Sequence, residues 1–299
     1  MKIFITGGMG FVGQHICRHL LQIGHQVTAC GRSAKQDKIA HPDFTYLSID
    51  TSVKGDWQEQ ISQFDTIINL AGVTIFKRWT DTYKQSIYNT RIQTTRNIVS
   101  AMSENTTLFS ASALGYYGPC LEDTITESNP PGKDFLAAVC KDWETEALKA
   151  TKKNCRVVIG RFGVVLGHGG GALQSMLPAF RMMLGGPLGN GKQWLPWIHI
   201  QDLCRGIFFL TGNADIEGVF NFCSPKPLRN SAFTRALGNA LNRPAVIPAP
   251  AFIIRLIFGE LAESLLTGQK AIPEQLIKNG FSFQFSTIEQ TLSDLLESK

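Results

Sequence analysis

The sequence has no pairing pattern among its cysteines. Seven cysteines, an odd number without any Cys-x-x-Cys spacing, are spread over 299 residues at positions 17, 30, 120, 140, 155, 204 and 223. Disulfide frameworks and structural zinc sites both depend on regularly spaced cysteines. His15 and His19 have the i, i+4 spacing of a metal pair, but no third ligand accompanies them. We therefore predict reduced thiols, a cytoplasmic protein and no metal site.

Blocks of one charge are also missing. The 29 Lys and Arg residues and 24 Asp and Glu residues leave a formal charge of +5, without any run of lysine or arginine. Proteins that bind nucleic acid usually concentrate basic residues in one patch or stripe. We expect no nucleic-acid partner, whereas an anionic small molecule is compatible with the charge.

No hydrophobic stretch is long and uninterrupted enough to span a bilayer, which takes about 20 predominantly apolar residues. The most apolar late segment, Ala251 to Leu266, contains Arg255, Glu260 and Glu263 and is interpreted as an amphipathic helix. We expect no membrane segment and no membrane partner. We also expect no cleaved signal, because a buried strand is predicted from residue 2.

A glycine-rich turn near the N-terminus is the most informative feature that the sequence does contain. An apolar run over residues 2–6 predicts a buried strand, and a helical pattern follows the glycines. Glycine lets the strand turn sharply, lets the backbone approach a pyrophosphate and lets the helix pack on the sheet, while the helix directs free N–H groups at the phosphates. We predict a dinucleotide site whose phosphates are held by Gly7, Gly10, Phe11, Val12 and Gly13.

The end of the second predicted strand lacks an acidic residue. No Asp or Glu occurs between Gln26 and Gln36, and Arg32 follows the strand directly. An acidic residue at this point would bind the ribose hydroxyls of NAD, whereas a guanidinium suits the 2′-phosphate of NADP. We therefore predict NADP(H) in preference to NAD(H), with Arg32 on the phosphate. Asp50, after a third predicted strand over 44–49, is placed to reach the adenine edge.

Strands and helices alternate over the first 167 residues, without a repeat of the solenoid type. This alternation predicts an α/β fold with a doubly wound parallel (Rossmann-type) sheet. Further strands are predicted over 66–70, 108–110 and 156–159, helices over 79–102 and after the N-cap Asp134, and a loop over 122–133. We expect a dinucleotide-binding domain over 1–167, to which 192–223 partly returns.

Glycine-rich segments at 168–171 and 185–191 mark a change in composition. We expect a smaller mixed substrate lobe over 168–299, whose last segment covers about 245–299. The elements predicted in this half are an apolar helix between the two glycine-rich segments, an edge strand over 194–200, a strand over 219–222, and helices over 202–210 and 232–241.

Motifs distributed over nearly the whole chain resemble a known family. Thr6-Gly7-Gly8-Met9-Gly10-Phe11-Val12-Gly13, Asn69-Leu70-Ala71-Gly72 and the segment Trp197 to Leu203 resemble motifs of the extended short-chain dehydrogenase/reductases, which include nucleotide-sugar epimerases and dehydratases. The segments 78–80, 91–95, 115–118 and 280–283 resemble an atypical branch, the epimerase family with a C-terminal domain of unknown function.

The resemblance implies a nicotinamide cofactor, often NADPH in this branch. It also implies further positions that contact the cofactor. These are Leu70, Ala71 and Gly72 on the adenosine side, and the backbone of Gly163 and Val164 at the carboxamide.

The resemblance fails at the catalytic residues. The superfamily uses a serine near the end of the fifth strand and a Tyr-x-x-x-Lys motif. Ser112 matches the serine and Lys141 the lysine, which would also hold the nicotinamide ribose, but Ala137 occupies the tyrosine position. The tyrosine hydroxyl gives or takes the proton of the reacting carbonyl or alcohol, and alanine has no such group. Tyr116 and Tyr117 are the candidates to replace it.

Two functions therefore stay open. The first is an NADP-dependent oxidoreductase or epimerase that acts on a small carbonyl or alcohol substrate by altered chemistry. The second is a catalytically silent NADPH-binding sensor or partner-binding protein, which Ala137 favours. We expect a monomer or a homodimer, and the sequence does not name the substrate.

Overall fold

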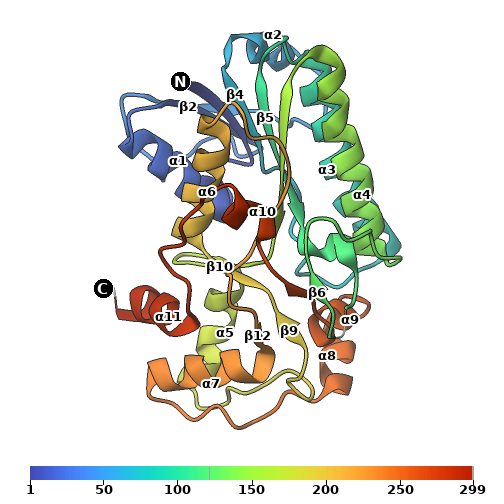
Figure 1. Cartoon of the computed structure of the whole chain (residues 1–299), viewed down its shortest axis with the longest axis vertical. Coiled ribbons are helices and arrows are strands. Elements are labelled where there is room, and N and C mark those ends of the chain that lie inside the picture. Colours follow the sequence, from blue (N-terminus) through green and yellow to red (C-terminus); the bar gives the residue numbers. More distant parts are fainter. Residues whose placement is uncertain (121, 298–299) are drawn as a thin grey trace.

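A seven-stranded parallel sheet forms the centre of the protein in this computed structural model, which describes residues 1–120 and 122–297 (Figure 1). From edge to edge, its strands are β11 (Gly218–Phe222), β7 (Arg156–Phe162), β5 (Thr107–Ala113), β4 (Thr66–Asn69), β1 (Lys2–Thr6), β2 (Gln26–Gly31) and β3 (Phe44–Ser48). The chain winds outward in both directions from β1, and ligands of such sheets bind where the direction reverses. The predicted fold class is confirmed.

Helices cover both faces of the sheet (Figure 1). One face shares a hydrophobic core with α1 (Phe11–Gln22), α6 (Ile200–Gly212) and α10 (Glu274–Lys278). The other packs against α2 (Trp57–Gln60), α3 (Asp81–Ala101) and α4 (Phe135–Leu148), with short 3₁₀ turns η1 (Ile61–Gln63), η2 (Leu114–Tyr117) and η3 (Lys149–Lys153). Every residue of β4 is buried, as expected for a strand covered on both sides.

Side-chain caps explain where the two long helices of the second face begin. The Thr80 hydroxyl accepts a hydrogen bond from the backbone N–H of Tyr83 at 3.2 Å and starts α3. Asp134, the predicted cap of α4, accepts one from the N–H of Ala137 at 2.8 Å. Each cap satisfies an N–H that has no acceptor inside the helix.

A smaller lobe lies at the carboxyl end of the sheet, at the bottom of Figure 1. It contains β8 (Val164–Leu166), α5 (Gly171–Arg181), β9 (Trp194–Leu195), β10 (Trp197–His199), β12 (Leu228–Arg229), α7 (Asn230–Leu241), α8 (Ala251–Phe258), α9 (Leu261–Leu266) and α11 (Ile288–Glu297). Leu173, Phe180, Trp197, Phe233 and Leu292 are buried together in its core. No helix in the described part of the chain is long and apolar enough to cross a membrane.

The single edge strand predicted over 194–200 is wrong. Trp194–Leu195 pairs antiparallel with β12, whereas Trp197–His199 pairs parallel with β8. Pro196 separates the two strands, since it has no N–H to donate, and its carbonyl accepts a hydrogen bond from the N–H of Val164 at 2.7 Å.

Two further predictions for local structure are corrected. The helix expected over 251–266 is two helices, α8 and α9, because Gly259 between them has φ +59°, a conformation that ends a helix. The loop expected over 122–133 contains a short strand, β6 (Thr124–Ile125), which pairs with β13 (Lys270–Ala271). In both cases a distant part of the chain or a single backbone conformation overrides the local pattern.

Candidate cofactor and catalytic site

The glycine turn between β1 and α1 has a geometry that only glycine fits. Gly7 has φ +67°, and a Cβ atom on it would lie 3.0 Å from the carbonyl oxygen of Leu70. A Cβ on Gly13 would lie 2.3 Å from the Gly7 carbonyl oxygen, inside contact distance. The turn is closed by a 2.9 Å hydrogen bond from the Gly10 N–H to Gly7. Bare backbone therefore faces the ligand edge of the sheet.

The first turn of α1 offers backbone donors without competition. Gly10 is its N-cap and supplies no side-chain acceptor, and the first turn holds no acidic residue. The N–H groups of Phe11, Val12 and Gly13 consequently have no acceptor inside the helix, and the positive end of the helix dipole lies beside them. This arrangement suits a pyrophosphate.

A pocket of about 430 Å³ opens beside this turn, at the carboxyl ends of β1, β2 and β4. It brings together seven of the residues predicted to contact the cofactor. These are Gly7, Gly10, Arg32, Asp50, Leu70, Ala71 and Gly72.

Arg32 and Asp50 are the charged residues among those that line the pocket. Arg32 is exposed, whereas the Asp50 carboxylate accepts hydrogen bonds from the N–H and hydroxyl of Ser52, at 3.0 and 2.6 Å. Sequence reasoning missed the other lining residues, among them Ser33 and Tyr46; the Tyr46 hydroxyl donates to the Ser33 carbonyl at 2.8 Å. Only the pairing of β2 with β3 reveals these two.

The backbone N–H groups of Gly163 and Val164 are already occupied. The N–H of Gly163 donates to the Phe222 carbonyl at 3.0 Å, and that of Val164 to the Pro196 carbonyl at 2.7 Å. A carboxamide contact through these N–H groups is therefore not available. Glycine is needed at 163 because a Cβ there would lie 2.6 Å from the Pro196 oxygen.

Ser112 lies inside a buried hydrogen-bond network instead of facing the pocket. Its hydroxyl donates to a Glu144 carboxylate oxygen at 2.6 Å. The same carboxylate accepts two hydrogen bonds from the Arg161 guanidinium, at 2.8 and 2.7 Å. Ser112, Glu144 and Arg161 are all at least 94% buried, and Ser112 and Arg161 are register partners on β5 and β7.

Tyr117 belongs to the same network. Its hydroxyl donates to the Asn221 side-chain oxygen at 2.7 Å and accepts from Arg161 at 2.7 Å. Burial raises the pKa of Tyr117 above its ordinary value although Arg161 lies beside it. Burial also opposes the charge on Arg161, but Glu144 and Tyr117 outweigh it and its pKa is raised. Tyr116 is half-buried, and the centre of its ring lies 3.4 Å from the Arg161 guanidinium carbon.

The face of α4 that packs against Ser112 does not carry Lys141. Cys140 and Glu144, four residues apart, both contact Ser112, and burial raises the pKa of the Cys140 thiol to about 11. Lys141 is exposed on the neighbouring face, while Ala137 is completely buried. The predicted grouping of Ser112 with Lys141 is therefore not formed. Glu144 lies four residues after Cys140, so both side chains are on the same face of α4, and this spacing is the sequence signal that could have indicated the network.

Arg91 contacts the segment 72–73, which lines the pocket. Its guanidinium donates to the carbonyls of Ile87 at 3.0 Å and Val73 at 3.2 Å, and burial lowers its pKa. A Cβ on Gly72 would lie 2.9 Å from the guanidinium carbon, so glycine makes room for it. The sequence resemblance included Arg91 but assigned it no role.

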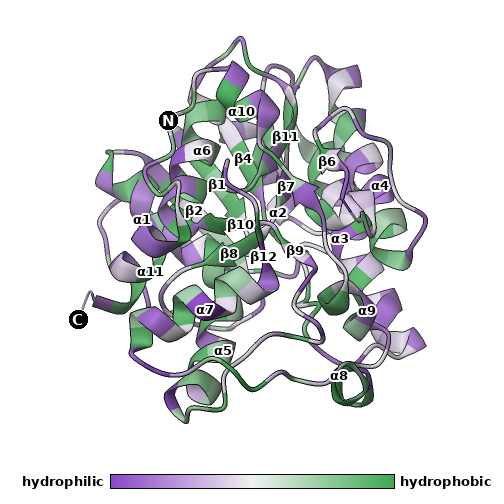
Figure 2. Cartoon of the chain, turned by 60° about the horizontal axis from the view of Figure 1, so that its bottom comes forward, coloured by the Kyte–Doolittle hydropathy of each residue, from purple (hydrophilic) through white to green (hydrophobic). Residues whose placement is uncertain are grey.

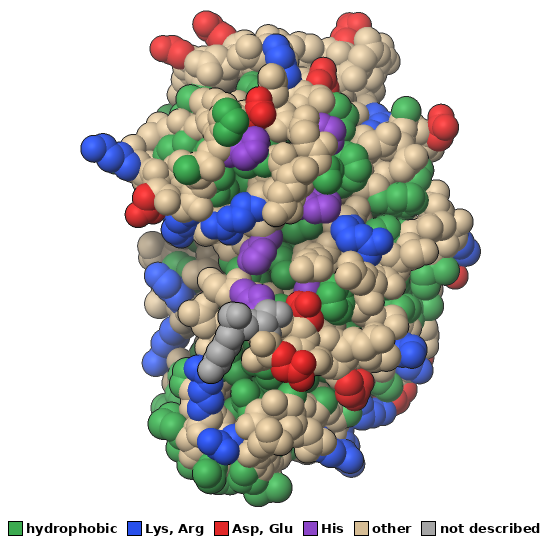
Figure 3. Space-filling view, turned by 90° about the vertical axis from the view of Figure 1, so that its left-hand side faces the viewer, with side chains coloured by type: hydrophobic (Ala, Val, Ile, Leu, Met, Phe, Trp, Pro, Cys, Tyr) green, Lys and Arg blue, Asp and Glu red, His purple; other side chains and the backbone are tan. Residues whose placement is uncertain are grey.

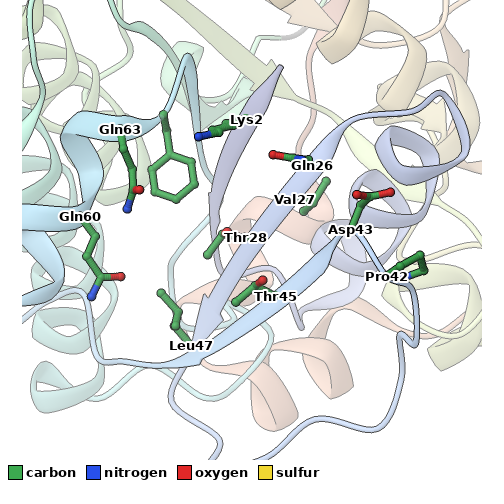
Figure 4. Close-up of a pocket in the computed structure, with 11 residues that line it drawn as sticks. Lys2, Gln26, Val27, Thr28, Pro42, Asp43, Thr45, Leu47, Gln60 and Gln63 are labelled. Atoms are coloured by element: carbon green, nitrogen blue, oxygen red, sulfur yellow. The ribbon is translucent and has the colours of Figure 1, made fainter.

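A second pocket, of about 380 Å³, lies at the amino ends of β1, β2 and β3, opposite the carboxyl ends at which the first pocket opens (Figure 4). Residues at the beginning of the strands, including Lys2, Gln26 and Asp43, line it together with Gln60 and Gln63. Because ligands of doubly wound sheets bind at the carboxyl ends of the strands, this hollow is separate from the cofactor site.

Comparisons with known proteins match the chain over nearly its full length. The NAD dependent epimerase/dehydratase family pattern matches residues 3–223, and a domain of unknown function, DUF1731, matches residues 249–295. The chain is 36% identical to the epimerase family protein SDR39U1 homolog, chloroplastic, of Arabidopsis thaliana, covering 99% of this chain and 87% of that protein. It is 38% identical to an epimerase family protein of Staphylococcus epidermidis, covering 99% of each.

A solved structure is also similar over its whole length. The crystal structure of the human epimerase family protein SDR39U1, isoform 2, with NADPH superposes with a TM-score of 0.89 at 31% identity, covering all of both chains. The chain therefore belongs to the NAD dependent epimerase/dehydratase family, in the group that carries the C-terminal DUF1731 domain.

Proposed function

We propose that this protein is a cytoplasmic, NADP(H)-binding oxidoreductase or epimerase-like protein of the extended short-chain type. Its substrate would be a small carbonyl or alcohol, handled without the usual catalytic tyrosine. The observation that carries the proposal is that the glycine turn and Arg32 line the same pocket. The NADPH in the similar human structure supports the same cofactor.

In this proposal the chain holds the cofactor chiefly through its backbone. The N–H groups at the start of α1 bind the pyrophosphate, Arg32 binds the 2′-phosphate, and the backbone of residues 70–72 flanks the adenosine. The nicotinamide, when bound, would supply or accept a hydride. The Arg91 guanidinium packs against Gly72 and donates a hydrogen bond to the Val73 carbonyl, which stabilises this turn.

Tyr116 is the hydroxyl that we assign to the substrate side. Ser112 and Tyr117 already donate their protons to Glu144 and Asn221, so neither is free to serve a substrate without breaking the network. The Tyr116 ring is half-buried and its face lies on Arg161.

The closed network also favours a second candidate, a catalytically silent NADPH-binding protein. All polar groups beside Ser112 are satisfied by one another, which is the state expected of a structural core. The two candidates share the cofactor and differ only in whether hydride transfer occurs.

Cofactor choice is tested by fluorescence titration of NADPH and NADH into the wild type and Arg32→Ala. We expect NADPH to bind about 10 to 100 times more tightly than NADH, and Arg32→Ala to remove that preference. Lys35→Ala, an exposed cation outside the pocket lining, is the matched control. Equal binding of both cofactors by the wild type would contradict the assignment of Arg32.

Hydride transfer is tested by stopped-flow fluorescence of bound NADPH against a panel of carbonyl compounds. Oxidation of the cofactor that is lost in Tyr116→Phe and kept in Tyr117→Phe supports an enzyme with Tyr116 as the proton donor. Absence of oxidation across the panel, with NADPH still bound, supports the silent protein.

A further inference from the structure

The end of the small lobe carries an unusually apolar surface, which we call the lower apolar surface. Nine large hydrophobic side chains on it are between 38% and 77% exposed. They are Met182, Met183, Leu184, Val246, Ile247, Phe252, Ile253, Leu256 and Ile257. Scattered exposed apolar residues are ordinary, but a group of this kind marks an interaction site.

Backbone hydrogen bonds join two of the segments that carry these residues. The N–H of Ile247 donates to the Gly185 carbonyl at 3.1 Å, and that of Ala249 to the Pro187 carbonyl at 2.9 Å. The second of these segments leads directly into α8, whose only buried residue is Ile254. In Figure 2, α8 is among the most strongly hydrophobic elements and lies at the end of the lobe.

Basic residues predominate in the segments that carry this surface. Residues 163–201 and 218–259, which form most of the lobe, contain seven Lys and Arg residues and no Asp or Glu. The rest of the chain has 22 basic and 24 acidic residues, so these two segments account for the whole positive excess. The acidic residues of the lobe lie on its other helices, α9 and α11. Arg181 precedes Met182 directly, Arg243 is three residues before Val246, and Arg255 lies on α8. Figure 3 shows hydrophobic side chains at the bottom of the molecule, with Lys and Arg beside them and Asp and Glu above them.

The acidic groups that approach this surface come from α9. The Arg255 guanidinium forms a 2.8 Å ion pair with Glu263, in which both side chains are more than half exposed. An exposed pair of this kind is held weakly and can exchange partners. Glu260 is already paired with Lys84 of α3 at 2.7 Å, away from the surface.

We infer that the lower apolar surface docks on the headgroup region of an anionic membrane. Exposed apolar side chains flanked by arginines match a bilayer interface, where the apolar groups enter the acyl boundary and the cations meet lipid phosphates. A second copy of the chain is a poorer occupant, because a two-fold contact would bring Arg181, Arg243 and Arg255 of one copy against the same arginines of the other. Among the residues that the structure describes, Glu263 is the one acidic side chain that pairs with any of them. With eight residues, α8 lies on such a surface and does not cross it.

This inference revises the expectation that the protein has no membrane partner. That expectation came from the absence of a spanning segment and from the charges that interrupt residues 251–266, and neither shows which apolar residues are exposed. The inference does not depend on the cofactor or on hydride transfer.

Vesicle flotation tests the inference on the full chain. The probes are large unilamellar vesicles of phosphatidylcholine and phosphatidylglycerol at a 7:3 ratio, with pure phosphatidylcholine vesicles alongside. We expect binding to the anionic vesicles, at least fivefold weaker binding to the neutral ones, and release by 0.5 M salt. Absence of binding to either vesicle, or equal binding to both, would overturn the inference.

Variants separate this surface from the rest of the molecule. Leu256→Ser should lower the partition coefficient about tenfold, and the pair Arg181→Gln with Arg243→Gln should lower it by a similar factor on anionic vesicles alone. Val53→Ser, which removes a 62% exposed apolar residue from the sheet domain, is the matched control and should bind like the wild type. Thermal unfolding of each variant checks that it is folded.

Light scattering on the same samples tests the competing occupant. A dimer that Leu256→Ser converts to a monomer would assign the surface to a second copy and overturn the membrane inference. A wild type whose oligomeric state is unchanged by Leu256→Ser, together with weaker flotation, supports it.

Discussion

The two halves of the carboxyl edge of the sheet are built on opposite principles. At β1, β2 and β4 the edge is open, with a pocket of about 430 Å³ lined largely by small residues and backbone. At β5 and β7 the edge is closed by α4, and Ser112, Glu144, Arg161 and Tyr117 hydrogen-bond one another. In the first half, backbone N–H groups stay available to a ligand. In the second half, the polar side chains are hydrogen-bonded to one another.

The difference follows from what it costs to bury each kind of group. Backbone N–H groups at a helix start can remain exposed to water until an anion arrives. A buried carboxylate and guanidinium cannot remain unpaired, because an isolated buried charge costs several kcal/mol. In this chain the Glu144 carboxylate and the Arg161 guanidinium pair with each other, with the Cys140 thiol beside them.

Breaking the closed half should give the largest effect. Glu144→Gln leaves the buried Arg161 charge without its carboxylate, so we expect the free energy of unfolding to fall by about 3–5 kcal/mol in urea denaturation. Glu146→Gln, on the same helix, is the control. Its partners Arg96 and Lys149 are half exposed, so its loss should cost about 1 kcal/mol or less. Equal losses in the two variants would show that the network is not the stabilising element.

Breaking the open half should affect binding more than folding. Gly13→Ala places a Cβ 2.3 Å from the Gly7 carbonyl oxygen and must distort the turn. We expect the affinity for NADPH to fall at least about tenfold in fluorescence titration. Gly212→Ala is the control, since its Cβ would meet ring atoms at an ordinary 3.8 Å. Unchanged affinity in Gly13→Ala would remove the turn from the cofactor site.

Ser112→Ala distinguishes a structural serine from a catalytic one. Because Glu144 keeps both hydrogen bonds to Arg161, we expect a loss of only about 1–2 kcal/mol in stability. NADPH affinity should not change, since Ser112 does not line the pocket. If a reaction is found and this variant abolishes it while stability is kept, Ser112 acts on the substrate and the closed half must open.

The smallest expected effect is a decrease of stability in mild acid, which we attribute to His199 at the end of β10, where the lobe meets α6 of the sheet domain. Burial lowers the pKa of His199 below its usual 6.5; its ring accepts a hydrogen bond from the Gln201 N–H and stacks on Phe285. The unfolded chain therefore binds a proton first as pH falls, and the free energy of unfolding should decrease below about pH 6.5. His199→Gln should flatten that slope in urea titrations between pH 7 and 5. An unchanged slope would assign the acid sensitivity to other groups.

Local patterns predicted the fold class and most elements of the sheet. The alternation of apolar strands with helices, the cap at Asp134 and the glycine spacing each depend on residues within one turn or strand. The open half of the edge could be predicted for the same reason, because it consists of a single turn and the ends of adjacent strands.

The sequence could not show which way the candidate catalytic side chains face. A helix rotates by about 100° per residue, so the step from Cys140 to Lys141 decides between a buried contact and solvent. Arg161 has no local signal at all, since its partners are Ser112, beside it across the sheet, and Glu144, on the helix above.

The sequence by itself determined the doubly wound sheet, the glycine turn and the position of Arg32, because these are set by backbone conformation and short-range periodicity. Only the tertiary structure decided that Ser112 and Tyr117 are bound inside a network and that the apolar residues of α8 lie outside. Whether a polar group is satisfied, or an apolar one covered, depends on neighbours that the chain brings from far along its length.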